Sequence, residues 1–251
     1  MTRPSSSAPP HAAPEVQPRN RPLYAQVRER LIRRLAEGAW PAGAMLPSEP
    51  ALAAELGVSQ GTVRKALDAL TAENLLVRRQ GRGTFVARHD ERRILFQFFR
   101  LVPDQGERQF PESRVLAVTT AAAKIRERAR LSLPAGARVI RIRRLRLMGG
   151  HATIAESIVL PEALFPGLSG RVLPNNLYGF YAEEYGVSIA RASERLKAIN
   201  LSPPDAALLG AAAGTAALLI DRAAIAIDGQ PVEWRLSRCL TRHLHYASEL
   251  V

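Results

Sequence analysis

The chain has 251 residues, enough for two modest domains that each bury a hydrophobic core. Its 35 basic and 23 acidic side chains give a formal net charge of +12, which favours polyanionic partners without locating their binding site. The single cysteine, Cys239, excludes an internal disulfide framework and a cysteine-only metal site, and no apolar run approaches the roughly 20 residues that span a bilayer, so we expect a cytoplasmic protein with no membrane partner.

Residues 1–20 are rich in proline, serine and alanine and lack the apolar segment of a signal peptide. This composition predicts a disordered tail. Its arginines could contact a polyanion, but a solvated tail is the simpler interpretation.

The segment from Ser48 to Val86 predicts two short helices that meet at a glycine and are followed by a basic hairpin. Ser48 and Ser59 are of the type that caps a helix start, and Gly57 allows a left-handed turn. After Ser59, apolar residues recur at helical spacing, and two short strands, 75–79 and 84–87, surround a glycine-rich turn. With an opening helix at about 23–37, residues 21–87 predict a winged helix-turn-helix domain, which places one helix in the DNA major groove.

The polar face of the second helix begins with small residues and continues with basic ones, which suits a helix end that approaches bases and phosphates. The hairpin tip adds glycines and an arginine. The candidate DNA-binding residues are Ser48, Gln60, Gly61, Thr62, Arg64, Lys65, Gln80, Gly81 and Arg82. The alternative is an ordinary solvated hairpin in a small helical domain.

Four motifs in this segment resemble the DNA-binding domain of the GntR family of bacterial transcription regulators. They are LPSE at 46–49, LGVS at 56–59, TVRKAL at 62–67 and GRGTFV at 81–86. The resemblance implies phosphate or base contacts at Thr62, Arg64, Gln80 and Gly81, and a homodimer on a double-stranded, pseudo-palindromic operator.

Two positions depart from the family pattern. The family often has arginine after the LPSE and LGVS motifs, where this chain has Pro50 and Gln60. Fewer cations weaken phosphate attraction, and glutamine pairs well with adenine. We therefore expect an operator that differs from the commonest one of the family.

Charged residues at 88–93 predict a linker, and residues 94–251 predict a second domain. Glycine turns at 149–150 and 228–229 each join two strand-like runs and predict hairpins. The expected strands are 94–101, 139–148, 152–160, 188–200, 216–227 and 231–240, and the expected helices are 119–131, 161–164, 176–185 and 204–209. This mixture predicts an α+β domain built on an antiparallel sheet.

The order of these elements resembles the UTRA effector-binding domain of the HutC subgroup of GntR regulators, a fold similar to that of chorismate lyase. The segments that carry the resemblance are 144–161 and 228–238. It implies a pocket for a small metabolite and dimerisation through this domain. It also implies a regulator that is released from its operator by the metabolite.

Arg144 and Arg146 lie two residues apart in a predicted strand, so both side chains point to one face and could bind a carboxylate or phosphate. By resemblance, the candidate effector-binding residues are Phe99, Arg100, Arg144, Arg146, Glu156, Asn176, Tyr178 and Glu233. Glu156 and Glu233 could equally be ion-pair partners of the arginines, and Tyr178 could belong to the core. Relatives often carry tyrosine where this chain has Cys239, which argues against the familiar sugar phosphates as ligands.

An enzyme and an architectural DNA binder are the two alternative functions. A lyase-like enzyme would need a nucleophile or an acid/base pair, and the sequence has no phosphate loop, nucleophile elbow or zinc-ligand spacing. We therefore expect no catalytic residues, no metal and no cofactor. An architectural DNA binder without a ligand is the other alternative.

Overall fold

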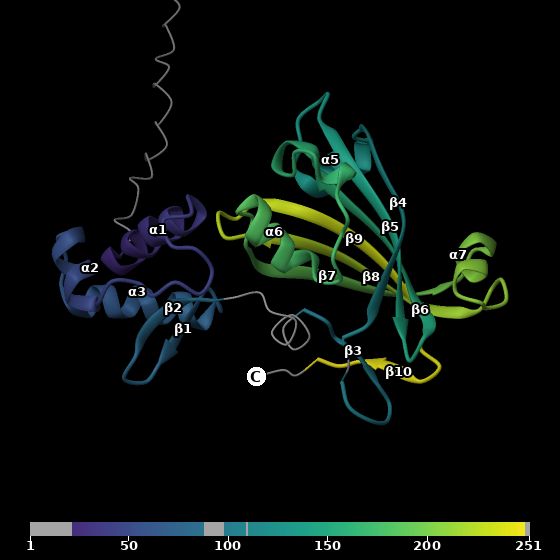
Figure 1. Cartoon of the computed structure of the whole chain (residues 1–251), viewed down its shortest axis with the longest axis horizontal. Coiled ribbons are helices and arrows are strands. Elements are labelled where there is room, and N and C mark those ends of the chain that lie inside the picture. Colours follow the sequence, from purple (N-terminus) through teal and green to yellow (C-terminus); the bar gives the residue numbers. More distant parts are fainter. Residues whose placement is uncertain (1–21, 88–97, 109, 249–251) are drawn as a thin grey trace, which may run out of the picture.

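The computed structural model describes residues 22–87, 98–108 and 110–248, which form two lobes (Figure 1). The predictions of a disordered tail at 1–20 and a linker at 88–93 concern residues outside these ranges. No helix of the described residues is long and apolar enough to cross a membrane.

The N-terminal lobe consists of three helices and a hairpin. Its elements are α1 (Leu23–Ala36), α2 (Glu49–Leu56), α3 (Gln60–Ala72), β1 (Leu76–Arg79) and β2 (Gly83–Val86). The predicted caps are present, because Ser48 Oγ accepts a hydrogen bond from the backbone N–H of Ala51 and Ser59 Oγ accepts one from Thr62. Gly57 ends α2 with φ = 67°. The apolar stripe of α3 is buried against α1 and α2, which fixes the polar face of α3 outward.

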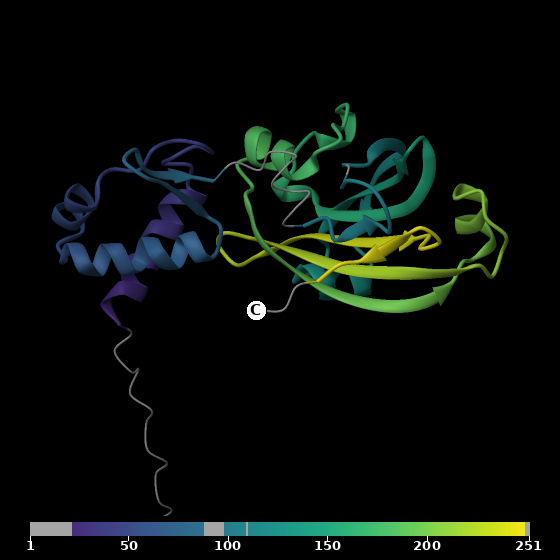
Figure 2. The same ribbon diagram turned by 90° about the horizontal axis from the view of Figure 1, so that it is seen from below.

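The C-terminal lobe is built on a six-stranded antiparallel sheet of order β4-β5-β6-β9-β8-β7. Its strands are β4 (Glu112–Ala122), β5 (Arg138–Met148), β6 (His151–Pro161), β7 (Ile189–Asn200), β8 (Ala216–Ala226) and β9 (Pro231–Cys239). Figure 2 shows the long strands nearly edge-on, as a curved sheet. The predicted α+β class is therefore correct, and both predicted glycine hairpins are present.

Helices cover parts of this sheet. The sheet is accompanied by α5 (Ile125–Leu131), α6 (Leu177–Tyr185), α7 (Pro203–Leu208) and the 3-10 turns η1 (Glu162–Leu164) and η2 (Leu168–Gly170). Side chains of a strand alternate between the two faces, and in β5 Ile140 and Ile142 pack in the cluster with α6, whereas Val139 packs with Leu131 of α5. The same alternation places Arg144 and Arg146 on the α6 side.

Two sequence predictions for this lobe were wrong. Residues 119–122 were expected to be helical but belong to β4, because pairing such as Thr119 with Arg141 of β5 overrides the local preference of an alanine-rich stretch. In the expected strand 94–101, residues 94–97 lie outside the described ranges, and Phe98–Arg100 is not a strand. The strand β3 begins at Leu101 and runs to Pro103, where it pairs with β10 (Leu244–Tyr246), an element not expected from the sequence.

Two glycines of the helix-turn-helix should respond oppositely to alanine. Gly57→Ala places a Cβ at φ = 67° and should destabilise the lobe by about 1–2 kcal/mol. Gly61→Ala meets only Ser59 Oγ, at 3.9 Å, within a helix and should stabilise the lobe by about 0.5–1 kcal/mol. Amide hydrogen exchange in α2 and α3 of the full chain measures both changes. Equal effects of the two substitutions would contradict the left-handed turn at residue 57.

Candidate nucleic-acid interface and ligand cavity

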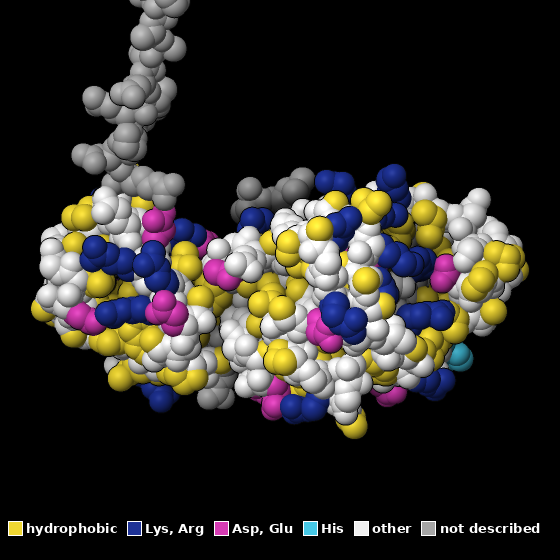
Figure 3. All heavy atoms as spheres, turned by 90° about the horizontal axis from the view of Figure 1, so that it is seen from above, with side chains coloured by type: hydrophobic (Ala, Val, Ile, Leu, Met, Phe, Trp, Pro, Cys, Tyr) yellow, Lys and Arg dark blue, Asp and Glu magenta, His cyan; other side chains and the backbone are white. Residues whose placement is uncertain are grey.

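The nine candidate DNA-binding residues lie at the start of α2, on the first turns of α3 and at the β1–β2 turn. All are exposed except Thr62, which is half-buried. The hydroxyl groups of Thr62 and Ser59 are 2.8 Å apart and hydrogen-bonded. Figure 3 shows basic side chains on both lobes of the face drawn, so charge distribution does not by itself identify the interface. Exposure at a helix start and a hairpin tip is the geometry that a winged helix-turn-helix requires.

An acidic residue that was not among the candidates joins this interface. Glu49 Oε2 accepts a hydrogen bond from Arg64 Nε at 2.9 Å, and Glu49 Oε1 accepts one from Arg78 Nη1 at 3.0 Å. Arg78 Nη2 also donates to Asp68 Oδ1 at 2.7 Å. The β1–β2 hairpin thus lies beside α3 (Figure 1) and is linked to it by charged side chains.

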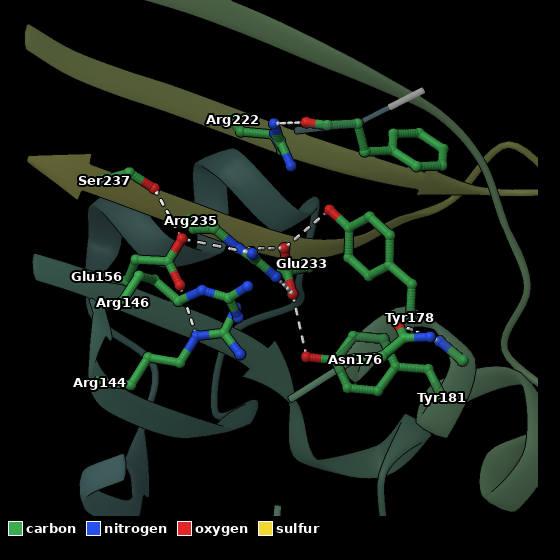
Figure 4. Close-up of polar contacts among 12 residues, drawn as sticks. Arg144, Arg146, Glu156, Asn176, Tyr178, Tyr181, Arg222, Glu233, Arg235 and Ser237 are labelled. Carbon is green, nitrogen blue, oxygen red and sulfur yellow. Dashed lines mark hydrogen bonds and ion pairs between the residues drawn. The ribbon is translucent and has the colours of Figure 1, made fainter. Parts of the chain in front are cut away.

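The second site is a cluster of buried charged residues on the α6 side of the large sheet. It brings together Arg144 and Arg146 of β5, Glu156 of β6, Arg222 of β8, and Glu233 and Arg235 of β9 (Figure 4). A cavity of about 30 Å³ lies among them, lined also by Phe98, Phe99, Phe110, Asn175, Asn176, Leu177 and Tyr178. Buried charges are costly unless they are paired and hydrogen-bonded, so the contacts of each one matter.

Glu233 has no exposed surface and accepts four hydrogen bonds. Tyr178 donates to Oε1 at 3.1 Å and Tyr181 to Oε2 at 3.0 Å, both from α6. Arg235 Nε and Nη2 donate to the same two oxygens at 2.9 and 2.8 Å. Burial and the nearby Glu233 charge raise the pKa of Tyr178 to about 12, so its hydroxyl remains a donor. These bonds fasten the first turns of α6 to the sheet.

Glu156 pairs with two arginines of the cluster, Arg144 and Arg235. It lies directly opposite Arg144 in the β5–β6 register, and Arg144 Nε donates to it. Ser237 Oγ donates to Glu156 Oε1 at 3.1 Å, and Arg235 Nη1 lies 3.5 Å from the same oxygen. Burial alone would raise the pKa of Glu156, but the charges of Arg144, Arg235 and Arg146 outweigh burial and hold it far below its usual value. Glu156 is therefore a carboxylate, and an acceptor, at any physiological pH.

Two arginines of this cluster, Arg222 and Arg235, were missed by the sequence analysis. They face each other directly across β8 and β9, an arrangement of like charges that destabilises a sheet. Arg222 donates through Nε to Glu194 Oε1 at 2.6 Å and through Nη2 to the backbone carbonyl of Phe98. An arginine within the apolar run of residues 216–227, and the alternation of polar and apolar residues at 233–237, were the available signals.

The predicted effector-binding residues are brought together with one exception. Phe99, Arg144, Arg146, Glu156, Asn176 and Tyr178 line the cavity, and Glu233 lies behind Tyr178 and Arg235. Arg100 instead lines a neighbouring cavity of about 230 Å³ with Glu194, Arg222 and Tyr246. Asn176 caps α6, because its Oδ1 accepts a hydrogen bond from the N–H of Gly179 at 3.0 Å.

A large hollow and the single cysteine also lie in the described part of this lobe. A hollow of about 790 Å³ beside residues 103–107 and the β5–β6 turn is lined by none of the buried charged residues. Cys239 packs in the core with Leu101, Ile154 and Ile220, and burial raises the pKa of its thiol. Within the described residues, no group of three or more His, Cys, Asp and Glu side chains could hold a metal ion.

Comparison with known proteins gives two family matches. Residues 23–86 match the model for bacterial regulatory proteins of the gntR family, and residues 106–245 match the UTRA domain. The chain is 31% identical to the histidine utilization repressor of Pseudomonas putida, over 80% of this chain and 81% of that protein. It is also 31% identical to the mannosyl-D-glycerate transport/metabolism system repressor MngR of Escherichia coli, over 74% of this chain and 77% of that protein.

A solved structure from Bordetella bronchiseptica, described as the ligand-binding domain of a GntR-family transcriptional regulator, shares the fold of the C-terminal lobe. It is 37% identical, covers 61% of this chain and 96% of its own, and superimposes with a TM-score of 0.56. The large sheet with its buried charged cluster therefore belongs to the region in which that protein is described as binding a ligand.

The charged cluster predicts a specific acid sensitivity. Because the pKa of Glu156 is lower in the folded chain than the ordinary 4.5, the folded state gains stability above that value and loses it as the pH falls below it. Glu156→Gln should cost about 3 kcal/mol at neutral pH, and the difference from wild type should shrink below about pH 4.5.

Urea unfolding of the full chain between pH 7 and pH 3 measures this difference, in a Trp40→Phe background so that only Trp234 of the C-terminal lobe reports by fluorescence. Glu107→Gln, outside the cluster, is the control. A difference that stays constant over the whole pH range would show that the Glu156 charge does not contribute to stability.

Proposed function

We propose, on the basis that this chain belongs to the GntR family of bacterial regulatory proteins and carries a UTRA domain, that it is a transcription repressor released from its operator by a small anionic metabolite. Two relatives of similar length that it matches over most of the chain are named repressors, which supports the repressor role. Regulators rather than enzymes make up this family, so the lyase alternative is set aside.

On the DNA side, the proposal assigns base and phosphate contacts to the nine exposed or half-exposed residues around the start of α3 and the hairpin tip. Gln60 and Gly61 open α3, and Arg64 and Lys65 follow one turn later. Small residues at the helix start allow close approach, while the longer ones reach phosphates and guanine edges. With Gln60 and Pro50 in place of the usual arginines, we propose an operator that is distinct from the commonest one of the family.

On the effector side, one observation carries the proposal: four buried arginines share the cluster with only two buried glutamates, Glu156 and Glu233, while the half-buried Glu194 pairs with Arg222 at its edge. In addition, Arg144 Nη1 is buried and has no hydrogen-bond partner within the described residues. A guanidinium donor that is removed from water favours an acceptor such as a carboxylate or phosphate oxygen. The aromatic rings of Phe99 and Phe110 support a ligand with an apolar part.

The proposed release mechanism follows from the size of the cavity. At about 30 Å³ it has room for one or two water molecules, so a metabolite must displace side chains to enter. Arg222 both lines the cavity and holds the Phe98 carbonyl. An anion that draws Arg222 away would remove the hydrogen bond to the carbonyl of Phe98, the first described residue after the proposed linker. A differential affinity of about 1–3 kcal/mol between the two arrangements is sufficient for control.

The proposal includes two chains that pair through residues 94–251 and present two copies of α3 to the half-sites of a pseudo-palindrome. It keeps residues 21–87 as the DNA-binding domain, 88–93 as the linker and the cytoplasm as the place of action, since the operator is there. A ligand-independent architectural DNA binder would bind its operator equally well in the presence of every metabolite in a library of small acids.

Removal of a proposed DNA contact should weaken operator binding without affecting the effector site. Arg64→Ala is expected to reduce affinity for the operator by roughly 1–3 kcal/mol, because it removes an exposed guanidinium from the reading helix. Fluorescence anisotropy with a labelled operator duplex, selected from random sequences by the wild-type chain, measures this loss. Unchanged affinity would remove Arg64 from the interface.

Removal of a cavity arginine should abolish the response and preserve DNA binding. Arg146→Gln tests this more cleanly than Arg144→Ala, because loss of Arg144 leaves the buried Glu156 without its closest cation. Metabolites that release the wild-type chain from its operator should fail to release Arg146→Gln at ten times the concentration. Arg143→Gln, an exposed arginine of the same strand on the opposite face, is the matched control and should respond normally. A normal response of Arg146→Gln would contradict the proposed cavity.

A further inference from the structure

The acidic residue Glu49 lies within the proposed DNA interface, where a negative charge repels phosphates. It is the first residue of α2, directly after the capping Ser48, and its side chain is only 15% exposed. The backbone of a capped helix start holds it in place, and the positive end of the helix dipole favours its charge. Its position is therefore determined by the fold rather than by a flexible surface contact.

Two arginines from different elements converge on this carboxylate, one on each oxygen. Arg64 comes from α3 and bonds through Nε, while Arg78 comes from β1 and bonds through Nη1. Arg78 is held a second time by Asp68 of α3, so each of its terminal nitrogens donates one hydrogen bond to a carboxylate. Among the described residues Arg64 bonds through Nε alone, which leaves the N–H groups of its two terminal nitrogens for DNA. Its side chain is 57% exposed, against 40% for Arg78.

We infer that Glu49 is a positioning residue for DNA recognition. It orients the guanidinium of Arg64 toward the DNA groove, and through Arg78 it fixes the β1–β2 hairpin against α3, the helix proposed to enter that groove. This inference rests on the proposed contact of Arg64 with DNA. A planar guanidinium forms bidentate hydrogen bonds with a base edge or a phosphate only when the orientation of its plane is fixed. Arg78 then serves the interface by holding Glu49 and Asp68.

The inference makes a prediction opposite in sign to that of simple electrostatics. Loss of a carboxylate near DNA removes a repulsion and should strengthen binding to any duplex. If Glu49 orients Arg64, Glu49→Gln should instead weaken binding to the selected operator by roughly five- to tenfold, the lower range for one bidentate base contact. Binding to a random duplex should stay the same or become slightly tighter.

The experiment compares four variants of the full chain by fluorescence anisotropy on the selected operator and on a random duplex of equal length. Glu55→Gln removes another carboxylate of α2, one that pairs with Arg34 of α1. It should leave the ratio of the two affinities unchanged. Arg64→Ala should lower the ratio, and Glu49→Gln in the Arg64→Ala background should lower it no further. A general loss of folding would weaken binding to both duplexes, which the random duplex detects.

The outcomes separate the two proposals. If Arg64→Ala leaves operator affinity unchanged, the proposed DNA contact fails. If Arg64→Ala weakens binding and Glu49→Gln leaves it unchanged or strengthens it, the positioning role of Glu49 is wrong, and a strengthening would show that Glu49 withholds Arg64 from DNA. If Glu49→Gln folds poorly, Arg64→Lys is the variant to measure, because it keeps the positive charge but loses the planar guanidinium that Glu49 would orient. Operator binding by Arg64→Lys equal to wild type would overturn the inference.

Discussion

The C-terminal lobe depends on the pairing of charges that its own sheet buries. Strands β5, β6, β8 and β9 each direct at least one ionised side chain to the face that α6 covers, where water is excluded. Such charges are tolerated only if each meets an opposite charge or a hydrogen-bond partner. Glu156 and Glu233 meet this requirement, and the latter also binds the tyrosines of α6. The packing of α6 and the charge pairing around the cavity therefore depend on the same carboxylate, Glu233.

This arrangement is costly for stability, and in the proposed function it serves the binding of an anion. Facing arginines on β8 and β9 and a partly unsatisfied guanidinium on β5 are features that apolar residues of similar size would avoid. In the proposed function, an incoming anion would supply the acceptor that the protein leaves out. Arg222 connects the cavity to the backbone of Phe98, since it lines the cavity and donates a hydrogen bond to the Phe98 carbonyl.

The arginines that matter for the two proposed sites differ in burial. In the charged cluster of the C-terminal lobe the guanidinium groups are buried, so salt screens their pairing with carboxylates much less. In the N-terminal lobe Arg64 is exposed and would be mobile by itself, and a surface ion pair contributes little to stability. The value of its bond to Glu49 lies in orientation rather than in folding energy.

Local signals were enough to predict the helix-turn-helix, because caps, a left-handed glycine and helical periodicity are all features of the segment Ser48–Leu70. The sequence also located the hairpins at the glycine turns and the pair Arg144 and Arg146 on one face, since strand alternation is independent of what the strand packs against. Local preference failed at Thr119–Ala122, where pairing with β5 decides the conformation. Only the tertiary structure brought Arg222 and Arg235 to the cavity and Glu49 to Arg64, because these contacts join elements far apart in the chain and depend on strand order and register. Periodicity assigns a side chain to a face, but its partner is decided by which element packs there.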